Sequence, residues 1–283
     1  MNRKCWTLPL SLLMLLACSD NKNEGNGNNQ SELVFTASVT PYQEYNNGQL
    51  QEALVNWTFL EGDVISVWAV NDHQLPTGIG TPYRYDGNSF YAVNNPIYID
   101  DQQHTYYAIM PRTMVSDGVV SFSISANQST ENNFWENDLC TAYTTTRGSR
   151  VRFNFYHRLC CVCVNFLGDD LSGHDLQVRL NGIKQNVMLS LDNDDCIAAG
   201  TTTIVQPMKQ DEDFYAIVPP QSFVAGSSLV TVIMDNESIP IIFDESVRFE
   251  SGMMHYLDIT YTEDPDSGQR RFVALTGQII PWE

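Results

Sequence analysis

The chain has 283 residues, and 15 lysines and arginines against 34 aspartates and glutamates give a formal net charge of −19. This acidity argues against nucleic acid or an anionic lipid surface as the main partner, because both are bound through basic patches that displace counterions. Charged residues make up only 17% of the chain. Such a composition suits β-sheets with solvated polar outer faces better than a coat of surface helices.

A secretory signal opens the chain. A basic N-terminus precedes an apolar run at residues 8–16, which is too short to cross a bilayer about 30 Å thick. The run ends in Leu15-Leu16-Ala17-Cys18, which resembles a bacterial lipobox, where the cysteine is acylated and the preceding peptide is removed. We therefore predict a signal peptide at residues 1–17 and a lipid on Cys18 that anchors the protein to the outer membrane, at the cell surface. An ordinary signal peptide that happens to contain a cysteine is the alternative.

The residues that follow Cys18 are polar and rich in Asn and Gly, with no apolar side chain to bury. We expect residues 18–31 to form a flexible tether between the lipid and the folded part.

In the first half, period-two alternation and β-branched runs predict strands rather than helices. The predicted strands cover residues 33–40, 63–70, 83–85, 89–93, 105–110 and 118–124. Asp86-Gly87-Asn88 is typical of a tight hairpin turn. Residues 131–143 are the least strand-like segment and are predicted to hold a short helix or an irregular loop.

The second half repeats this pattern. Residues 151–166 form one bent strand or two, and further strands are predicted at 176–180, 187–191, 197–205, 213–218, 229–234, 239–243 and 254–261. Short strands at this spacing predict antiparallel β-sandwiches. Beyond the loop at 263–269, a final apolar strand must pair with a sheet edge, in this molecule or in another.

A short internal repeat predicts two similar domains. Tyr107-Ala108-Ile109-Met110-Pro111 recurs as Tyr215-Ala216-Ile217-Val218-Pro219, at the same place in each strand series. We predict one β-sandwich domain at residues 32–148, a second at 149–262, and a C-terminal strand or tail at 263–283.

The cysteines and histidines do not form a known catalytic or metal-binding motif. Beyond Cys5 and Cys18 the chain has an odd number of cysteines, whose spacing does not suggest a disulfide framework. The string His157-x-x-Cys160-Cys161-x-Cys163 is a candidate metal site, but neighbouring side chains on a strand point to opposite faces. Buried cysteines that behave as small hydrophobic residues are the favoured interpretation.

Two further chemical signals are weak. Asp192-Asn193-Asp194-Asp195 lacks the Gly and the distal Glu of a calcium-binding EF-hand loop, so a polar turn between strands is favoured. The histidines are dispersed, and no nucleophile elbow, phosphate loop or zinc-protease motif occurs. We predict no enzyme activity, no metal and no cofactor.

Several loose motifs occur in a characteristic order along the chain. They lie at residues 15–18, at Trp57 with 61–67, and at 106–111, 138–142, 153–159, 249–256 and 279–282. In this order they resemble the fimbrillin-like proteins of Bacteroidetes, a family that contains major and minor fimbrium subunits with their anchor and tip proteins. The resemblance covers essentially the whole mature chain.

The resemblance implies two tandem transthyretin-like β-sandwich domains and a role in adhesive surface fimbriae. Subunits of the family polymerise by strand exchange: a protease, often arginine-specific, removes an N-terminal strand, and the exposed groove accepts a strand from a neighbouring subunit. The resemblance therefore implies other fimbrial subunits as partners, together with a host or microbial surface ligand. Its strand-exchange candidates are Leu33, Val34, Phe35 and Val39 at one end of the chain, and Phe272, Val273, Leu275, Ile279 and Ile280 at the other.

One departure from the family bears on this mechanism. Between Cys18 and Arg84 the chain has no arginine, and its only lysine there is Lys22. An arginine-specific cut after the first strand has no site, so either another protease acts or the chain keeps its lipid and first strand, as an anchor would. A tip position is a third alternative to a stalk role.

A glycan-binding surface lipoprotein that does not polymerise is the alternative function. Such a protein would expose aromatic platforms, for which Trp68, Trp135 and Trp282 are candidates. The pair Phe134-Trp135, in the least regular segment, is the main candidate, although packing in the core is the favoured interpretation for each tryptophan.

Overall fold

The computed structural model describes residues 31–46, 49–53, 58–71, 74–148, 150–171, 173–264 and 266–275. Within these residues the chain is almost entirely β, with twenty-two strands and one short helix. The predicted signal peptide, Cys18, Ile279, Ile280 and Trp282 lie outside the described residues. No helix in the described part of the chain is long and apolar enough to cross a membrane.

The first part of the chain forms a closed sheet. Its strands, in spatial order, are β1 (Phe35–Val39), β11 (Val151–His157), β10 (Cys140–Thr146), β7 (His104–Met110), β4 (Val64–Val70), β5 (Thr81–Tyr85) and β6 (Phe90–Ala92). Alternation along β11 buries Val151, Phe153, Phe155 and His157 and exposes the residues between them. Because successive side chains of a strand point to opposite faces, the buried set fills the interior of this sheet.

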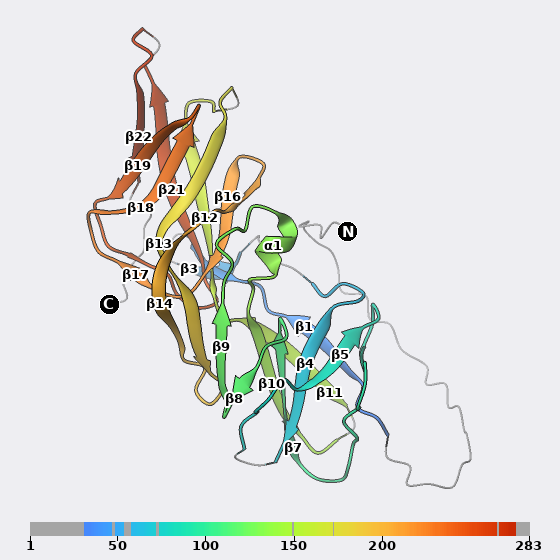
Figure 1. Ribbon diagram of the computed structural model, residues 1–283. Coiled ribbons are helices and arrows are strands. Elements are labelled where there is room, and N and C mark those ends of the chain that lie inside the picture. The colour runs from blue at the N-terminus through green and yellow to red at the C-terminus, as the bar shows by residue number, and fades with distance from the viewer. Residues whose placement is uncertain are drawn as a thin grey trace.

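A second sheet lies at the other end of the elongated molecule (Figure 1). Its order is β15 (Met208–Gln210), β16 (Asp213–Val218), β12 (Cys160–Gly168), β21 (Met254–Glu263) and β22 (Arg270–Ala274). Residues 160–164 of β12 are all buried, which means that this central strand is covered on both faces. The short, apolar and cysteine-rich run is therefore typical of a strand in the middle of a packed sheet.

The third sheet connects the two ends. It contains β19 (Glu237–Phe243), β18 (Ser227–Met234), β13 (Leu176–Ser190), β9 (Val119–Ser123), β8 (Val115–Ser116) and β14 (Cys196–Val205). Strand β13 is fifteen residues long and pairs with β18, β9 and β14. Leu180 pairs with Val230 on one side and Val205 on the other. Strands β18 and β9 therefore lie end to end along one side of β13, and β14 runs along the opposite side.

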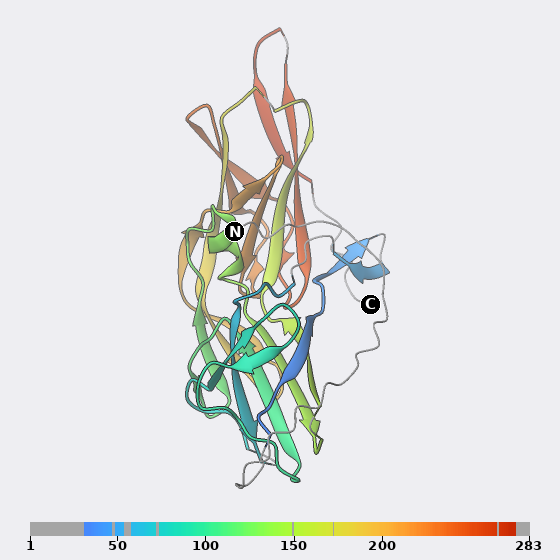
Figure 2. The same ribbon diagram turned by 90° about the vertical axis from the view of Figure 1, so that its right-hand side faces the viewer.

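Smaller elements complete the fold. The hairpin of β2 (Gln43–Asn46) and β3 (Gln49–Glu52) projects from the side of the molecule in blue (Figure 2), and β17 (Ser222–Phe223) pairs with β20 (Val247–Arg248). The helix, α1 (Glu131–Trp135), begins after Thr130, whose side chain accepts a hydrogen bond from the Asn133 amide and so caps its N-terminus.

The sheets correct the expected strand arrangement. The predicted sandwiches were antiparallel, but β1 pairs with β11 in parallel and so does β12 with β21, so the sheets are mixed. Hydrogen bonding also crosses the expected division after residue 148. Strand β11 lies beyond that point but closes the first sheet, and β9 before it pairs with β13 after it. The position of the domain boundary and the transthyretin-like topology stay predictions.

Two local predictions also need correction. Residues 176–180 and 187–191 were expected as separate strands, yet they are the two ends of β13. The turn-like pair Asn181-Gly182 does not end the strand, because Gly182 adopts φ +70° at a bulge that the ladder accommodates. The segment 131–143 does contain the expected short helix, but its last four residues begin β10.

Candidate functional site

The N-terminal strand β1 and the residues just before it contribute two anchoring side chains to the core of the first sheet. Leu33, just before the strand, is fully buried, and Phe35 is 2% exposed. The ring of Phe35 packs against Tyr83 and Phe90, each at a centroid distance of 5.1 Å, and against Phe153 at 4.9 Å. The strand therefore fills an aromatic pocket that would be vacant without it.

The other predicted residues of this strand are more exposed. Val34 is 37% exposed, and Val39 is half-buried at the edge of the core. Alternation explains the difference, since Leu33, Phe35 and Val39 share the inner face and Val34 points outward.

The backbone of β1 is held mainly on one side. Five consecutive residues pair with β11, from Phe35 opposite Val151 to Val39 opposite Phe155. With β6 the strand shares a single pair, Phe35 opposite Phe90. Removal of β1 would therefore expose the unpaired edge of β11 along its length, beside the aromatic pocket.

A buried tyrosine, Tyr42, follows β1 in the chain. Tyr42 is fully buried, its ring stacks on that of His157 at a centroid distance of 3.7 Å, and its hydroxyl donates to Asp138 Oδ1 at 2.9 Å. The next amide, that of Gln43, donates to the carbonyl of Gly252 at 3.0 Å. The segment after β1 is thus attached to residues from both halves of the chain. Sequence patterning gave no signal for Tyr42.

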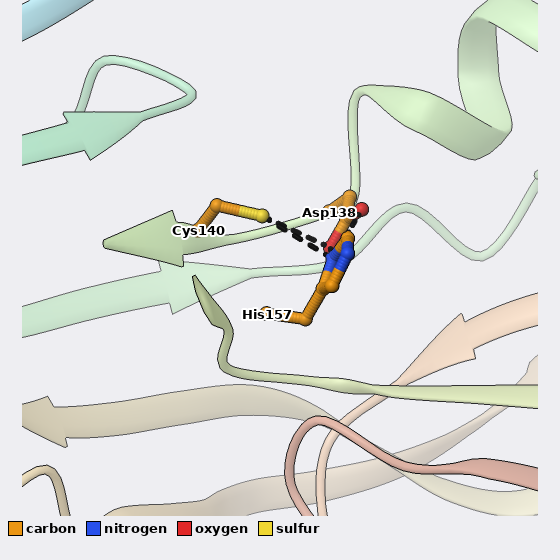
Figure 3. A group of neighbouring side chains, drawn as sticks. All are labelled: Asp138, Cys140 and His157. Atoms are coloured by element: carbon orange, nitrogen blue, oxygen red, sulfur yellow. Dashed lines mark hydrogen bonds and ion pairs between the residues drawn. The ribbon is translucent and has the colours of Figure 1, made fainter. Parts of the chain in front are cut away.

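Asp138, Cys140 and His157 place potential metal ligands within 4.8 Å of one another (Figure 3). Asp138 Oδ1 lies 3.0 Å from His157 Nδ1 and 3.6 Å from Cys140 Sγ, in addition to its contact with Tyr42. These groups converge on the buried Asp138 carboxylate. His157 Nδ1 also lies 2.9 Å from Asp138 Oδ2, so the carboxylate contacts the imidazole through both of its oxygens and acts as a hydrogen-bond acceptor for Tyr42.

The same carboxylate affects the protonation of the neighbouring cysteine. Burial, and then the neighbouring Asp138 carboxylate, raise the pKa of the Cys140 thiol well above its ordinary value. A thiol that stays protonated is a poor nucleophile. The sequence motif had grouped His157 with Cys160, Cys161 and Cys163, whereas the described contacts join it to Asp138 and Cys140.

The C-terminal candidate strand begins with β22, which pairs with β21 of the same chain. The ladder runs from Glu263 opposite Arg270 to Ile259 opposite Ala274. The expected pairing of the final strand with a sheet edge is therefore confirmed within this molecule. Phe272 is half-buried, 4.9 Å from the ring of Tyr261, whereas Val273 and Leu275 are 39% and 42% exposed.

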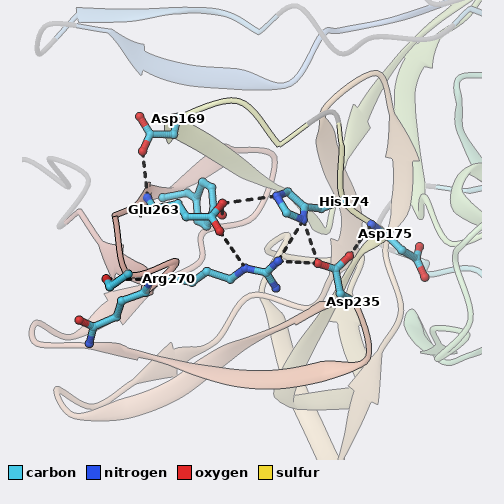
Figure 4. Close-up of polar contacts among 9 residues, drawn as sticks. Asp169, His174, Asp175, Asp235, Glu263 and Arg270 are labelled. Atoms are coloured by element: carbon cyan, nitrogen blue, oxygen red, sulfur yellow. Dashed lines mark hydrogen bonds and ion pairs between the residues drawn. The ribbon is translucent and has the colours of Figure 1, made fainter. Parts of the chain in front are cut away.

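An ion-pair cluster fixes the start of β22 (Figure 4). Arg270 contacts Asp235 at 2.8 Å and Glu263 at 3.6 Å, and His174 Nδ1 lies 2.8 Å from Asp235 Oδ2. The hydrogen bond from His174, followed by those from the Asp175 amide and Arg270, lowers the pKa of Asp235. Asp235 lies in the turn between β18 and β19, so the cluster connects β22 to the third sheet.

The aromatic residues proposed as a ligand platform are buried. Phe134 is 0% and Trp135 4% exposed, and their rings pack edge to face at 4.7 Å within α1. Trp68 is 7% exposed, and its indole donates to the carbonyl of Thr77. None of the three presents a flat exposed face, which agrees with the favoured interpretation of core packing and gives no support to a glycan platform at Phe134 and Trp135. All three side chains are part of the hydrophobic core.

These features define an all-β protein whose first strand closes a sheet and whose last described strand lies at a sheet edge. The fimbrillin-like family profile matches residues 53–282. The chain therefore belongs to the fimbrillin-like family, as its motifs predict. No curated protein matches the chain significantly.

Solved structures from Bacteroides share the fold. The "putative cell adhesion protein" of Bacteroides ovatus ATCC 8483 superposes with a TM-score of 0.62 at 18% identity, over 87% of this chain and 96% of that one. A protein of the same description from Bacteroides uniformis ATCC 8492 gives 0.60 at 17%, over 86% and 97%. A third, from Bacteroides fragilis NCTC 9343, gives 0.54 at 13%, over 89% and 99%. At these identities the likeness establishes the fold alone.

Proposed function

We propose that the protein is a cell-surface fimbrial component, a subunit or an anchor or tip protein, which assembles by β-strand exchange and supports adhesion. Membership of the fimbrillin-like family supports the fimbrial role and the surface location. The same role is consistent with solved relatives described as cell adhesion proteins. Its partners on this proposal are other fimbrial subunits and a host or microbial surface ligand.

The observation that carries the proposal is the way β1 is held. The strand inserts Leu33 and Phe35 into a pocket, yet its ladder runs almost entirely along β11. A strand from a neighbouring subunit could replace it by forming main-chain hydrogen bonds with β11 and placing alternate apolar side chains in the same pocket.

The donor side of the exchange lies at the C-terminus. Because β22 is paired within its own sheet, the remaining donor candidates are the predicted Ile279 and Ile280, which lie outside the described residues. Donation by Phe272, Val273 and Leu275 would first require β22 to leave β21.

The membrane attachment is a separate part of the proposal. A lipid on Cys18 would anchor the chain to the outer membrane, and the lack of arginine between Cys18 and Arg84 favours an anchor or tip over a stalk subunit. Intact mass and N-terminal sequencing of the protein from its native cell surface separate these roles. A chain that begins at acylated Cys18 is an anchor or a stand-alone lipoprotein, and one that begins after Thr40 without lipid has lost β1.

Strand exchange itself can be tested by locking β1 in place. Ser38 lies opposite Asn154 in the parallel ladder, so the double variant Ser38→Cys/Asn154→Cys offers a disulfide between β1 and β11. We expect the oxidised double variant to stay out of fimbriae and reduction to restore its incorporation, while each single variant assembles normally. Incorporation of the locked protein at the wild-type level would refute exchange of β1.

A further inference from the structure

The open sheet edges of the described chain differ in how they are protected. Strand β22 begins with two arginines, β19 contains Glu237 and Pro240, and β15 is three residues long with a central lysine. Strand β8 has only two residues. Short length, charge and proline are the usual devices that prevent an edge from pairing with another chain.

Strand β14 lacks these three devices. It runs for ten residues, Cys-Ile-Ala-Ala-Gly-Thr-Thr-Thr-Ile-Val, with no charge and no proline, and it pairs with β13 alone. Four of its residues are β-branched threonine or valine and two are isoleucine, all of which favour strands. Ile197 is 63% and Ile204 53% exposed, and Met188, the cross-strand neighbour of Ile197, is 51% exposed. Strand β14 is thus a long, exposed and partly apolar edge.

A bulge in the middle of β14 makes its outer face symmetric. The ladder shifts register between Lys184 and Asn186, where Gly200 adopts φ +78°. Ile197 and Ala199 precede the bulge and face outward with Met188 and Asn186, and Thr202 follows it and faces outward with Lys184. Ile204 is exposed between the inward-facing Thr203 and Val205. A regular strand would put Ile197 and Ile204 on opposite faces, but the extra residue puts them on the same face.

We propose that β14 is a self-association edge, which pairs antiparallel with β14 of a second copy about a two-fold axis at the bulge. In this register Ile197 lies opposite Ile204 of the second copy, and Ala199 lies opposite its Thr202. Directly opposite residues of an antiparallel pair share a face, so every outward side chain meets an outward one and every inward side chain meets an inward one. The apolar pair of Ile197 and Ile204 forms twice because a two-fold interface is isologous.

The symmetric outer face of β14 indicates a second copy as the occupant, and its lack of charge permits the contact. The chain carries a net charge of −19, so most surfaces of two copies repel each other, but β14 brings no charges opposite one another. The acidic turn Asp192–Asp195 precedes its first residue, and Asp194 of that turn is paired with Arg158 at 2.7 Å. Antiparallel pairing places the acidic turns of the two copies at opposite ends of the paired strands, so they do not face each other.

Sedimentation velocity across a concentration series tests this proposal. A ladder of this length buries less surface than a standard interface, so we expect a reversible dimer in the range of roughly 10–500 µM. Ile197→Lys, which places charges beside the partner strand, should abolish the concentration dependence. Ile242→Lys is the matched control, because Ile242 is 48% exposed on the protected edge β19 and should leave the dimer intact.

Hydrogen exchange locates the contact independently. The amides of residues 196–205 should become more protected at concentrations where the wild-type protein dimerises, and not in Ile197→Lys. A protein that stays monomeric throughout the series overturns the proposal, as does a dimer that Ile197→Lys leaves intact or that both variants lose equally. Protection of these amides only on addition of a different fimbrial subunit would overturn self-pairing and assign the edge to that subunit.

Discussion

The first and last described strands, β1 and β22, end the folded part of the chain in different structural settings. Strand β1 closes a sheet, and its Phe35 is buried among three aromatic rings. Strand β22 lies at a sheet edge, with Phe272 half-buried and Arg270 in a partly exposed ion-pair cluster. Apolar and polar residues alternate along β1, whereas β22 has two arginines followed by three apolar residues.

The difference shows where each strand derives its stability. Apolar burial stabilises a strand in proportion to the area removed from water, whereas exposed ion pairs contribute little. We therefore expect β1 to be fixed mainly by its side chains and β22 mainly by its backbone ladder. A partner that displaces β1 must supply an apolar side chain for the Phe35 pocket.

The largest effect should come from Phe35→Ala. Removing a buried aromatic ring leaves a cavity and costs about 3–5 kcal/mol in the free energy of unfolding. Urea unfolding measures this loss, and Val34→Ala on the outer face of the same segment should cost less than about 0.5 kcal/mol. Equal losses in the two variants would show that β1 is not held by its inner face.

Tyr42→Phe should cost less, about 1–3 kcal/mol, because the buried Asp138 carboxylate loses one hydrogen-bond donor while the aromatic packing remains. The matched control is Tyr45→Phe, since Tyr45 is 40% exposed. The same urea unfolding experiment compares the two. A loss for Tyr42→Phe no greater than that of the control would mean that the hydroxyl does not help to hold the end of β1.

Phe272→Ala should destabilise the protein by about 1–2 kcal/mol, a fraction of the cost for a fully buried phenylalanine. Hydrogen exchange should show the change confined to β21 and β22, the strands that this ring covers. Val273→Ala on the exposed face is the control. A loss as large as that of Phe35→Ala would remove the contrast between the two strands.

The smallest effect should come from Asp235→Asn, and it should depend on pH. The pKa of Asp235 is lowered below its ordinary 3.8 in the folded protein, chiefly by the hydrogen bond from His174. A lowered pKa contributes stability above the unfolded value, and this contribution is lost as pH falls through the folded value. The Tm of the variant should therefore lie slightly below that of the wild type at pH 7.

The difference in Tm should shrink as the pH falls below 4, where the wild-type carboxylate becomes protonated. High salt should also reduce it at pH 7, because the cluster is partly exposed. Asp266→Asn, on the exposed hairpin loop between β21 and β22, is the control and should show neither trend. A difference in Tm that grows toward acid pH would mean that the ionised form of Asp235 does not stabilise the folded protein.

Local features of the fold could be predicted because neighbouring residues cause them. Alternation located β4, β7 and β16 to within about two residues. The hairpin between β5 and β6 was also predicted correctly: Asp86 accepts hydrogen bonds from the amides of Asn88 and Ser89, and Gly87 adopts φ +101°. Asp and Gly favour this turn whatever surrounds it.

The candidate site could be predicted only in part. Leu33 and Phe35 follow from alternation, and the structure places both in the core. Tyr42 and Asp138 could not be paired from the sequence, because they are 96 residues apart and no local pattern links them. For Phe134 and Trp135 the sequence left a short helix and an irregular loop open, and only the structure shows that a short helix turns both rings inward.

The sequence by itself determined the all-β class, most strand positions, the acidic character and the family, because each depends on composition or on short-range pattern. Tertiary structure alone decided that β1 pairs in parallel with β11. It also decided that β13 is one long strand shared by β18, β9 and β14, and that β14 pairs with β13 alone. Such pairings depend on which backbone groups remain unpaired after all other strands have packed. No single segment of sequence contains that information.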